Sequence, residues 1–179
     1  MDGRYDQSEL NVYGAEDDFE MDTILGALEA TTERATANEL EPAGPDWKRL
    51  LAAPRCRADT FVRTDAPAEP GVYLWLRDND PQYVGTATSL RKRLSTHLGG
   101  GASLAGSSLR RNVCELLFQI PPSVTGNPTR QRVTSEQAAA IQRWLRGCEL
   151  SWVRSRSAGD AAAMETRLRR AFRPPLNRM

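Results

Sequence analysis

The stretch from residue 71 to residue 98 constrains the fold more than any other part of the chain. It opens with a run of strand-forming residues, passes through the turn-rich segment 78–81, and returns as a second strand-like run. Thr88 or Ser89 then precedes three leucines at the spacing of one buried helical face: Leu90, Leu94 and Leu98. The stretch therefore predicts a β-hairpin followed by an amphipathic helix.

Two tyrosine triplets mark the predicted hairpin, Gly71-Val72-Tyr73 in its first run and Tyr83-Val84-Gly85 in its second. The tyrosines are ten positions apart, and Arg93 follows the second tyrosine by another ten. Four residues further on stands His97, the one histidine of the chain, which shares a helix face with Arg93. A second polar block, METRLRRAFRPPLNRM, ends the chain and carries Glu165 and, twelve residues later, Asn177.

The order and spacing of these residues resemble the signature of the GIY-YIG nuclease family. The resemblance runs from about Ala66 to the C-terminus, with an insertion at about 99–146, and does not cover the first ~45 residues. It implies an α/β fold in which helices flank a small three-stranded, mainly antiparallel sheet, with a helical insertion and an N-terminal helical extension. The catalytic block is similar to that of the family's excision-repair members, although Thr86 stands where those often carry lysine. The other segments of that repair protein are not evident, so we expect a stand-alone nuclease.

The resemblance implies a set of catalytic residues: Tyr73, Tyr83, Arg93, His97, Glu165 and Asn177. Glu165 would bind one Mg²⁺ or Mn²⁺ ion, because a carboxylate is a hard oxygen ligand. Arg93 would hold the scissile phosphate with its planar, permanently charged guanidinium. Asn177 would orient Glu165 or the phosphate through hydrogen bonds.

Tyr73 is the expected general base, with assistance from His97 or Tyr83, and the sequence leaves open which tyrosine has this role. An unperturbed tyrosine with a pKa near 10 is only about a thousandth ionised at neutral pH. We therefore expect either that Arg93 lowers the pKa of the base or that the tyrosine relays a proton.

These residues predict a metal-dependent DNA endonuclease that leaves 5′-phosphate and 3′-hydroxyl ends. The alternative is a non-cutting nucleic-acid-binding protein, or a regulatory protein controlled by a partner, that retains the nuclease fold. Binding alone does not require Glu165, which favours the enzyme.

Charge divides the chain into an acidic and a basic part. Residues 1–45 carry a net charge of −10 and residues 46–179 carry +11, within an overall charge of +1. The basic part is the expected nuclease domain and would meet a polyanion. The residues that we expect to contact nucleic acid are Arg91, Lys92, Arg110, Arg111, Arg130 and Arg132. The insertion is either a DNA-contacting subdomain or a structural extension.

The acidic segment has three open interpretations. Its apolar stripe of Met21, Ile24, Leu25 and Leu28 indicates a short helix that packs on the body of the protein, covers the basic face, or docks a partner protein. The three cysteines are widely spaced and unpaired by any C-x-x-C motif, which argues against a disulfide framework or a structural zinc site. We expect a reducing cytoplasm, and no membrane span, because no apolar run approaches ~18 residues.

The remaining pattern predicts helices on either side of a third strand. Asp46 would cap a short helix, residues 109–118 would form another, and a Thr134–Gln137 capping box would begin a third. Residues 148–154 alternate as a strand does, and the last helix would start near Ser157.

Overall fold

The computed structural model describes residues 41–127 and 133–177. The described residues from Pro42 onward belong to one compact unit. The expected N-terminal helix with Met21 and Leu28, and the expected nucleic-acid contacts Arg130 and Arg132, lie outside the described residues.

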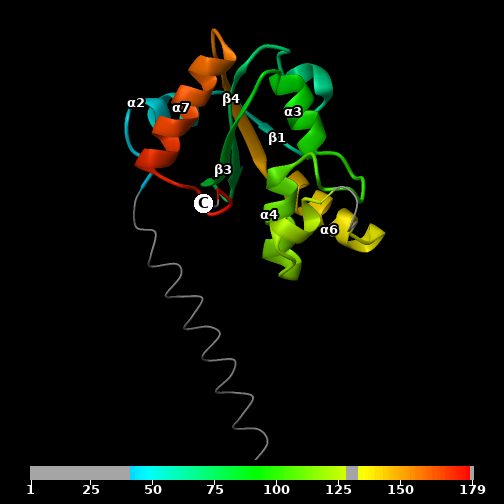
Figure 1. The fold of residues 1–179 in the computed structure, drawn as a ribbon. Helices are drawn as coiled ribbons and strands as arrows, with labels where there is room; N and C mark the ends of the chain where they lie inside the picture. Colours follow the sequence, from blue (N-terminus) through cyan, green and yellow to red (C-terminus); the bar gives the residue numbers. More distant parts are fainter. Residues whose placement is uncertain (1–40, 128–132, 178–179) are drawn as a thin grey trace, which may run out of the picture. The chain divides into compact units, whose positions relative to one another are not determined.

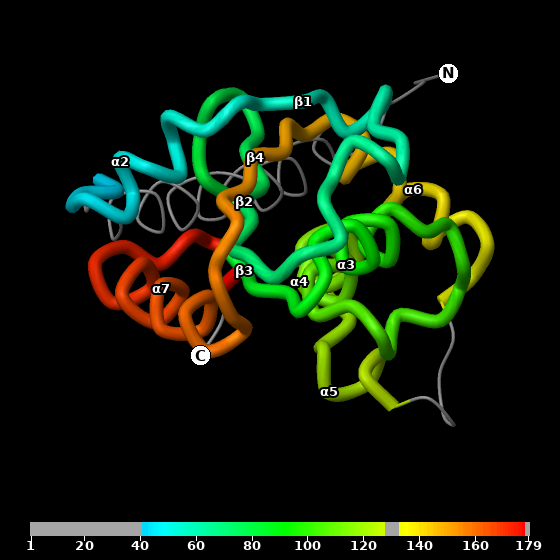
Figure 2. Tube along the Cα trace, turned by 90° about the horizontal axis from the view of Figure 1, so that it is seen from above, coloured from blue at the N-terminus to red at the C-terminus, as the bar shows by residue number. Residues whose placement is uncertain are grey.

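The described chain folds as a four-stranded antiparallel sheet with helices on both faces (Figures 1 and 2). The strands lie in the order β1-β4-β2-β3, with bounds β1 Arg55–Arg57, β2 Gly71–Arg77, β3 Asp80–Ala87 and β4 Glu149–Arg154. One face packs against α2 Pro45–Leu51 and α7 Ala158–Ala171. The other packs against α3 Leu90–His97, α4 Ser108–Phe118 and α6 Ser135–Arg146. Two short helices complete the fold, η1 Arg63–Asp65 and α5 Pro122–Thr125.

Strand β2 lies between β4 and β3, and helices cover both of its faces. Its alternate residues Val72, Leu74 and Leu76 pack with α2 and α7. Tyr73 and Trp75, which point to the opposite face, pack with α3, α4 and α6. An apolar strand with layers on both faces thus carries the Tyr73 hydroxyl into the α3–α4 layer.

The turn between β2 and β3 sets the register of the two tyrosines. Asp78 and Asn79 have positive φ angles of 52° and 72°, which match the right-handed twist of a two-residue hairpin loop. A register shift near Trp75 then brings this residue opposite Tyr83. As a result, Tyr73 pairs with Gly85 across the strands.

Several expectations from the sequence are confirmed. Ser89 caps α3, the Thr134–Gln137 capping box begins α6, and Ser157 caps α7. The expected third strand is β4, and the flanked antiparallel α/β sheet is as predicted.

Two details of the expected fold are wrong. The sheet has four strands rather than three, because residues 55–57 pair with β4 as β1. This strand is short and mostly exposed, so it lacks the apolar alternation that marks a strand in a sequence. Helix α2 is not capped by Asp46, since Gly44 holds the cap position and Pro45 begins the helix.

Candidate active site

The phenol of Tyr73 lies across Gly85 of the neighbouring strand. A Cβ atom at residue 85 would stand 2.6 Å from the Tyr73 hydroxyl oxygen and 2.9 Å from a ring carbon of Tyr83. The two tyrosine rings stack with their centroids 6.2 Å apart. Gly85 is therefore required by the close approach of two side chains, and it brings both tyrosines to one face of the sheet.

Gly85→Ala is expected to push Tyr73 out of place. We expect a loss of roughly 1–3 kcal/mol in unfolding free energy and a fall of roughly tenfold or more in cleavage rate. Gly101→Ala is the matched control, because a Cβ there meets nothing within 4 Å. Thermal melts and cleavage rates of both variants check this, and equal behaviour of the two would contradict the close approach.

His97 is fully buried and joins the first tyrosine to the start of α4. Its Nε2 atom lies 2.8 Å from the Tyr73 hydroxyl, and its Nδ1 atom lies 2.7 Å from Oγ of Ser107. Burial, followed by the nearby charges of Arg93 and Arg110, lowers the pKa of His97 from 6.5 to about 3. The imidazole is therefore neutral at physiological pH.

The lowered pKa of His97 predicts a loss of stability in mild acid. In the unfolded chain His97 becomes protonated near pH 6.5, whereas in the folded chain it becomes protonated only near pH 3. Acid therefore favours the unfolded state, and the free energy of unfolding falls as the pH falls from about 6.5 to about 3. We expect a loss of about 1.5 kcal/mol between pH 6.5 and pH 5, where carboxylates still contribute little. Urea unfolding of the wild type and of His97→Gln checks this. If both lose the same free energy over that range, His97 is not the group responsible.

Tyr73 does not have the lowered pKa expected of a direct base. Burial raises its pKa well above the usual value, the charges of Tyr83 and Glu165 add to this, and Arg93 alone opposes them. The expectation that Arg93 lowers this pKa overall is wrong, because only 2 % of the residue is exposed and the loss of solvent outweighs one guanidinium. Tyr73 is thus protonated at rest, which leaves the relay of a proton as its route to base catalysis.

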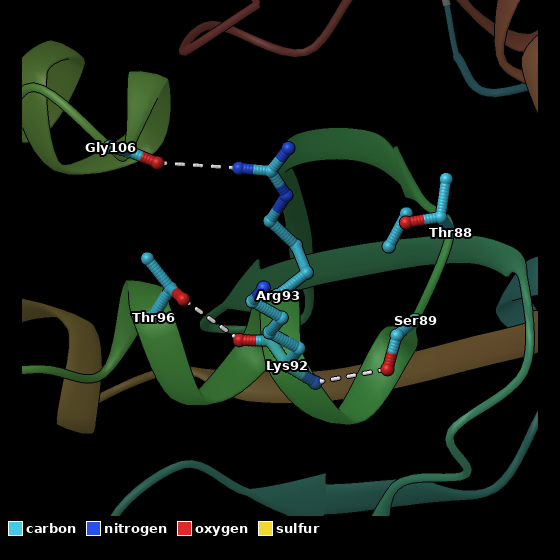
Figure 3. Close-up of a pocket in the computed structure, with 7 residues that line it drawn as sticks. Thr88, Ser89, Lys92, Arg93, Thr96 and Gly106 are labelled. Carbon is cyan, nitrogen blue, oxygen red and sulfur yellow. Dashed lines mark hydrogen bonds between the residues drawn. The ribbon is translucent and has the colours of Figure 1, made fainter.

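Arg93 lies on α3, half-buried, at the wall of a hollow of about 310 Å³ (Figure 3). Its guanidinium reaches across to donate one long hydrogen bond, 3.3 Å, to the Gly106 carbonyl oxygen. A guanidinium has five N–H donors. The hollow is otherwise lined by small and polar residues, namely Ala87, Thr88, Ser89, Lys92, Thr96 and Gly106. Lys92 and Arg93 make it a suitable place for a phosphate.

Glu165 lies on α7 and reaches back to the second triplet. The Thr86 hydroxyl donates a 3.0 Å hydrogen bond to one carboxylate oxygen, and Arg169 stands 3.6 Å from the other. The side chain is 19 % exposed and opens into a second hollow, of about 360 Å³, with Arg169, Arg170 and Arg173 on its wall. Thr86 thus positions the carboxylate, a contact that could not be expected from the sequence.

Asn177, which was expected to orient Glu165 or the phosphate, forms its hydrogen bonds with the backbone of Val84. Its side-chain carbonyl accepts a 2.7 Å hydrogen bond from the N–H of Val84, and its amide donates one of 2.7 Å to the Val84 carbonyl. The residue is 5 % exposed, and both ends of its amide pair with the edge of β3. Asn177 therefore holds the C-terminal segment against the strand that carries Tyr83.

Helix α4, in the expected insertion, contributes two serines to the site. Ser107 is the N-cap of α4 and contacts His97, while the Ser108 hydroxyl lies 2.8 Å from that of Tyr83. From the sequence this helix was expected only from residue 109 onward, which left both serines outside it. The sequence does contain a signal for this helix start, because a pair of serines directly before a helical stretch is typical of an N-cap.

Comparison with known proteins decides the family. A family model described as the GIY-YIG catalytic domain matches residues 77–179, more than half of the chain. The chain belongs to the GIY-YIG nuclease family. The matched region holds five of the six expected catalytic residues and begins four residues after the sixth, Tyr73.

A solved structure with some likeness to this GIY-YIG protein is the N-terminal endonuclease domain of UvrC from Thermotoga maritima, a crystal structure with its catalytic magnesium. The two chains share 24 % sequence identity, with 63 % of this chain and 88 % of that one covered and a TM-score of 0.37. No curated protein matches the sequence.

Two arginines of the GIY-YIG insertion that were expected to contact nucleic acid, Arg110 and Arg111, are largely withdrawn from solvent. Arg110, an expected nucleic-acid contact, is only 4 % exposed and donates to the carbonyl oxygens of Gly101 and Ser103. Arg111 is half-buried and donates to the carbonyl oxygen of Ala105. These two side chains hold the loop before α4 in place. On α3, Arg91 donates to the Ala66 carbonyl, while Lys92 stays exposed beside Arg93.

No helix within residues 41–127 and 133–177 has the length and apolar character needed to span a membrane.

Proposed function

We propose that this nuclease is a metal-dependent DNA endonuclease that hydrolyses phosphodiester bonds to 5′-phosphate and 3′-hydroxyl ends. The observation that carries the proposal is that three side chains from two helices act on the hydroxyl group of Tyr73. Arg93 from α3 and Glu165 from α7 both act electrostatically on Tyr73, and His97 hydrogen-bonds it. A nucleophile-activating group, a cation and a carboxylate are thus brought together from three separate elements.

The substrate's phosphates would bind to the cations around this centre. Arg93 and Lys92 line one hollow, and Arg169, Arg170 and Arg173 line the other. Guanidinium groups bind phosphate oxygens through paired N–H donors, so Arg93 is suited to the scissile phosphate and the arginines of the second hollow to its neighbours. A polyanion such as DNA could place phosphates against the cations of both hollows at the same time.

The donor set around Glu165 fits a magnesium or manganese ion. Among the described residues, no cluster of three or more His, Cys, Asp or Glu side chains could enclose a metal. The Glu165 carboxylate, which accepts from the Thr86 hydroxyl and pairs with Arg169 at 3.6 Å, opens to a hollow and suits a hard cation that keeps most of its water. Such an ion neutralises charge on the phosphate and stabilises the departing oxygen. Glu165 would hold it, and Thr86 would hold Glu165.

Proton removal from the attacking water would fall to Tyr73. Because its raised pKa keeps it protonated, Tyr73 must pass its own proton on as it accepts one from water. Two neighbours are in place to receive it, His97 and Tyr83. A neutral relay avoids placing a phenolate in a buried site.

Incubation with supercoiled, linear and single-stranded DNA, with and without Mg²⁺ or Mn²⁺, tests the proposal. We expect cutting only with metal, and products that a ligase can rejoin without prior phosphate transfer. Binding without cutting under every condition would favour the non-cutting alternative, in which the fold serves nucleic-acid binding or partner control.

The proposal extends to the organisation of the chain. We propose an acidic extension at residues 1–45, which would dock a protein partner or cover the basic face, and a nuclease domain at residues 46–179 in a cytoplasmic protein. Deleting the extension should raise DNA affinity and steepen its salt dependence if it covers basic side chains. Binding titrations at several salt concentrations check this, and an unchanged slope would favour the docking role.

A further inference from the structure

The ion pair between Arg169 and Glu165 is partly withdrawn from solvent. The arginine side chain is 34 % exposed and the glutamate side chain 19 %, and the nearest N and O atoms are 3.6 Å apart. Arg156 and Asp160, an i,i+4 pair at the start of the same helix, are 93 % and 44 % exposed. Solvent therefore screens the charges of Arg169 and Glu165 less than those of an ordinary surface pair.

The two carboxylate oxygens of Glu165 have different neighbours. Oε2 accepts the hydroxyl hydrogen of Thr86 at 3.0 Å, while Oε1 faces Nη1 of Arg169. The Thr86 donor is neutral, so within the described residues Arg169 is the one cation that pairs with this carboxylate. The proposed metal ion needs the same negative charge, and two cations that share one carboxylate repel each other.

Arg169 also has a second place in which to bind an anion. It lines the hollow of about 360 Å³ that opens on Glu165, and it lines the neighbouring hollow of about 480 Å³ together with Tyr83 and Ser108. An arginine at the wall of two hollows can reach either one by a change of side-chain rotamer. A DNA phosphate in the second hollow would offer the guanidinium two hydrogen-bond acceptors in place of the carboxylate.

We propose that Arg169 competes with the metal ion for Glu165 and exchanges this carboxylate for a DNA phosphate, so that metal and DNA bind cooperatively. The inference rests on the proposed function, in which Glu165 holds the metal. Pairing with Arg169 lowers the metal affinity of the carboxylate, and release of Arg169 to a phosphate restores it. By thermodynamic linkage, metal binding at Glu165 raises DNA affinity by the same factor. The carboxylate therefore has its full affinity for the ion only when substrate is bound.

Manganese titration without DNA tests the competition. Binding of Mn²⁺ to the full-length protein is followed by electron paramagnetic resonance of the free ion, and the binding that is lost in Glu165→Gln defines the site. We expect Arg169→Gln to bind Mn²⁺ about three- to tenfold more tightly than the wild type, and Arg169→Lys, which keeps the charge, to bind as the wild type does.

Arg170→Gln is the matched control for Arg169→Gln. Arg170 stands on the wall of the same hollow but is not the residue paired with Glu165. Its loss removes one positive charge from the same surface, where solvent screens it, and should change the Mn²⁺ affinity by less than about twofold.

DNA binding in EDTA tests the exchange of partners. The affinity for a short labelled duplex is measured by fluorescence anisotropy, with no metal and no cleavage. Glu165→Gln releases Arg169, so it should raise DNA affinity by about threefold when Arg169 is present and by less than about twofold when Arg169 is already glutamine. The removal of one negative charge acts in both backgrounds, so the difference between them isolates Arg169.

The outcomes separate this inference from the proposed function. Equal Mn²⁺ affinities in Arg169→Gln and Arg170→Gln, or equal effects of Glu165→Gln in the two backgrounds, would overturn the exchange even in a protein that cuts DNA. Mn²⁺ binding that is the same in Glu165→Gln as in the wild type would overturn the metal role of Glu165, and the inference with it. If Arg169→Gln fails to fold, Arg169→Ala carries the same test, because alanine favours the helix.

Discussion

Glu165→Gln is expected to abolish metal-dependent cleavage while leaving the fold intact. The amide oxygen of glutamine still accepts the hydrogen bond from Thr86, so the side chain keeps its place. The charge that binds the cation is lost, and with it several kcal/mol of transition-state stabilisation, or roughly a hundredfold or more in rate. Single-turnover cleavage in Mg²⁺, together with a melting curve, measures both effects.

The matched control for this substitution is Asp160→Asn. Glu165 also forms an i,i+4 ion pair with Arg169, and Asp160, in the first turn of the same helix, forms one with Arg156, which precedes the helix. Exposed pairs of this kind contribute only about 0.3–0.5 kcal/mol. Asp160→Asn should therefore cut at the wild-type rate. Full magnesium-dependent activity in Glu165→Gln would remove Glu165 from the mechanism.

Arg93→Lys should lower the rate by roughly a hundredfold although it keeps the charge. Lysine offers a single ammonium in place of a planar fork, and it cannot both span the hollow to Gly106 and hold two phosphate oxygens. The effect should appear in kcat more than in DNA affinity, because many other cations bind the substrate.

Arg55→Lys provides the comparison for Arg93→Lys. Arg55 is an arginine of β1 that donates to the Asn79 side chain, and β1 lies at the opposite edge of the sheet from β3. The same substitution there should leave cleavage unchanged. Equal losses in the two variants would mean that Arg93 acts through general stability.

The hairpin and the helix that follows it were predictable because their signals are local. The turn residues, the leucine spacing and the cap at Ser89 each act over a few positions, and the structure confirms all three. The catalytic roles of Tyr73, Arg93 and Glu165 stay a prediction. The structure does place Arg93 and Glu165 close enough to Tyr73 to influence its pKa.

The contacts that tune the candidate site could not be read from the sequence. Thr86 contacts Glu165 across 79 positions, and Ser107 contacts His97 across the ten positions that separate the end of α3 from the start of α4. The pKa of Tyr73 was misjudged for the same reason. Its charged neighbour was visible in the sequence, but the layer of helices that excludes water from it was not.

The pairing of Asn177 with Val84 bears on how this chain avoids aggregation. Strand β3 is an edge strand, and a bare edge is a template for pairing with other chains. Asn177 and the N–H of Leu176, which binds the Gln82 carbonyl, occupy that edge. During synthesis both tyrosines, Arg93 and Glu165 are added to the chain before Leu176 and Asn177, the residues that cover the edge of β3. Truncation just before Leu176 should therefore yield a protein that self-associates through β3 before any defect in its chemistry is measured.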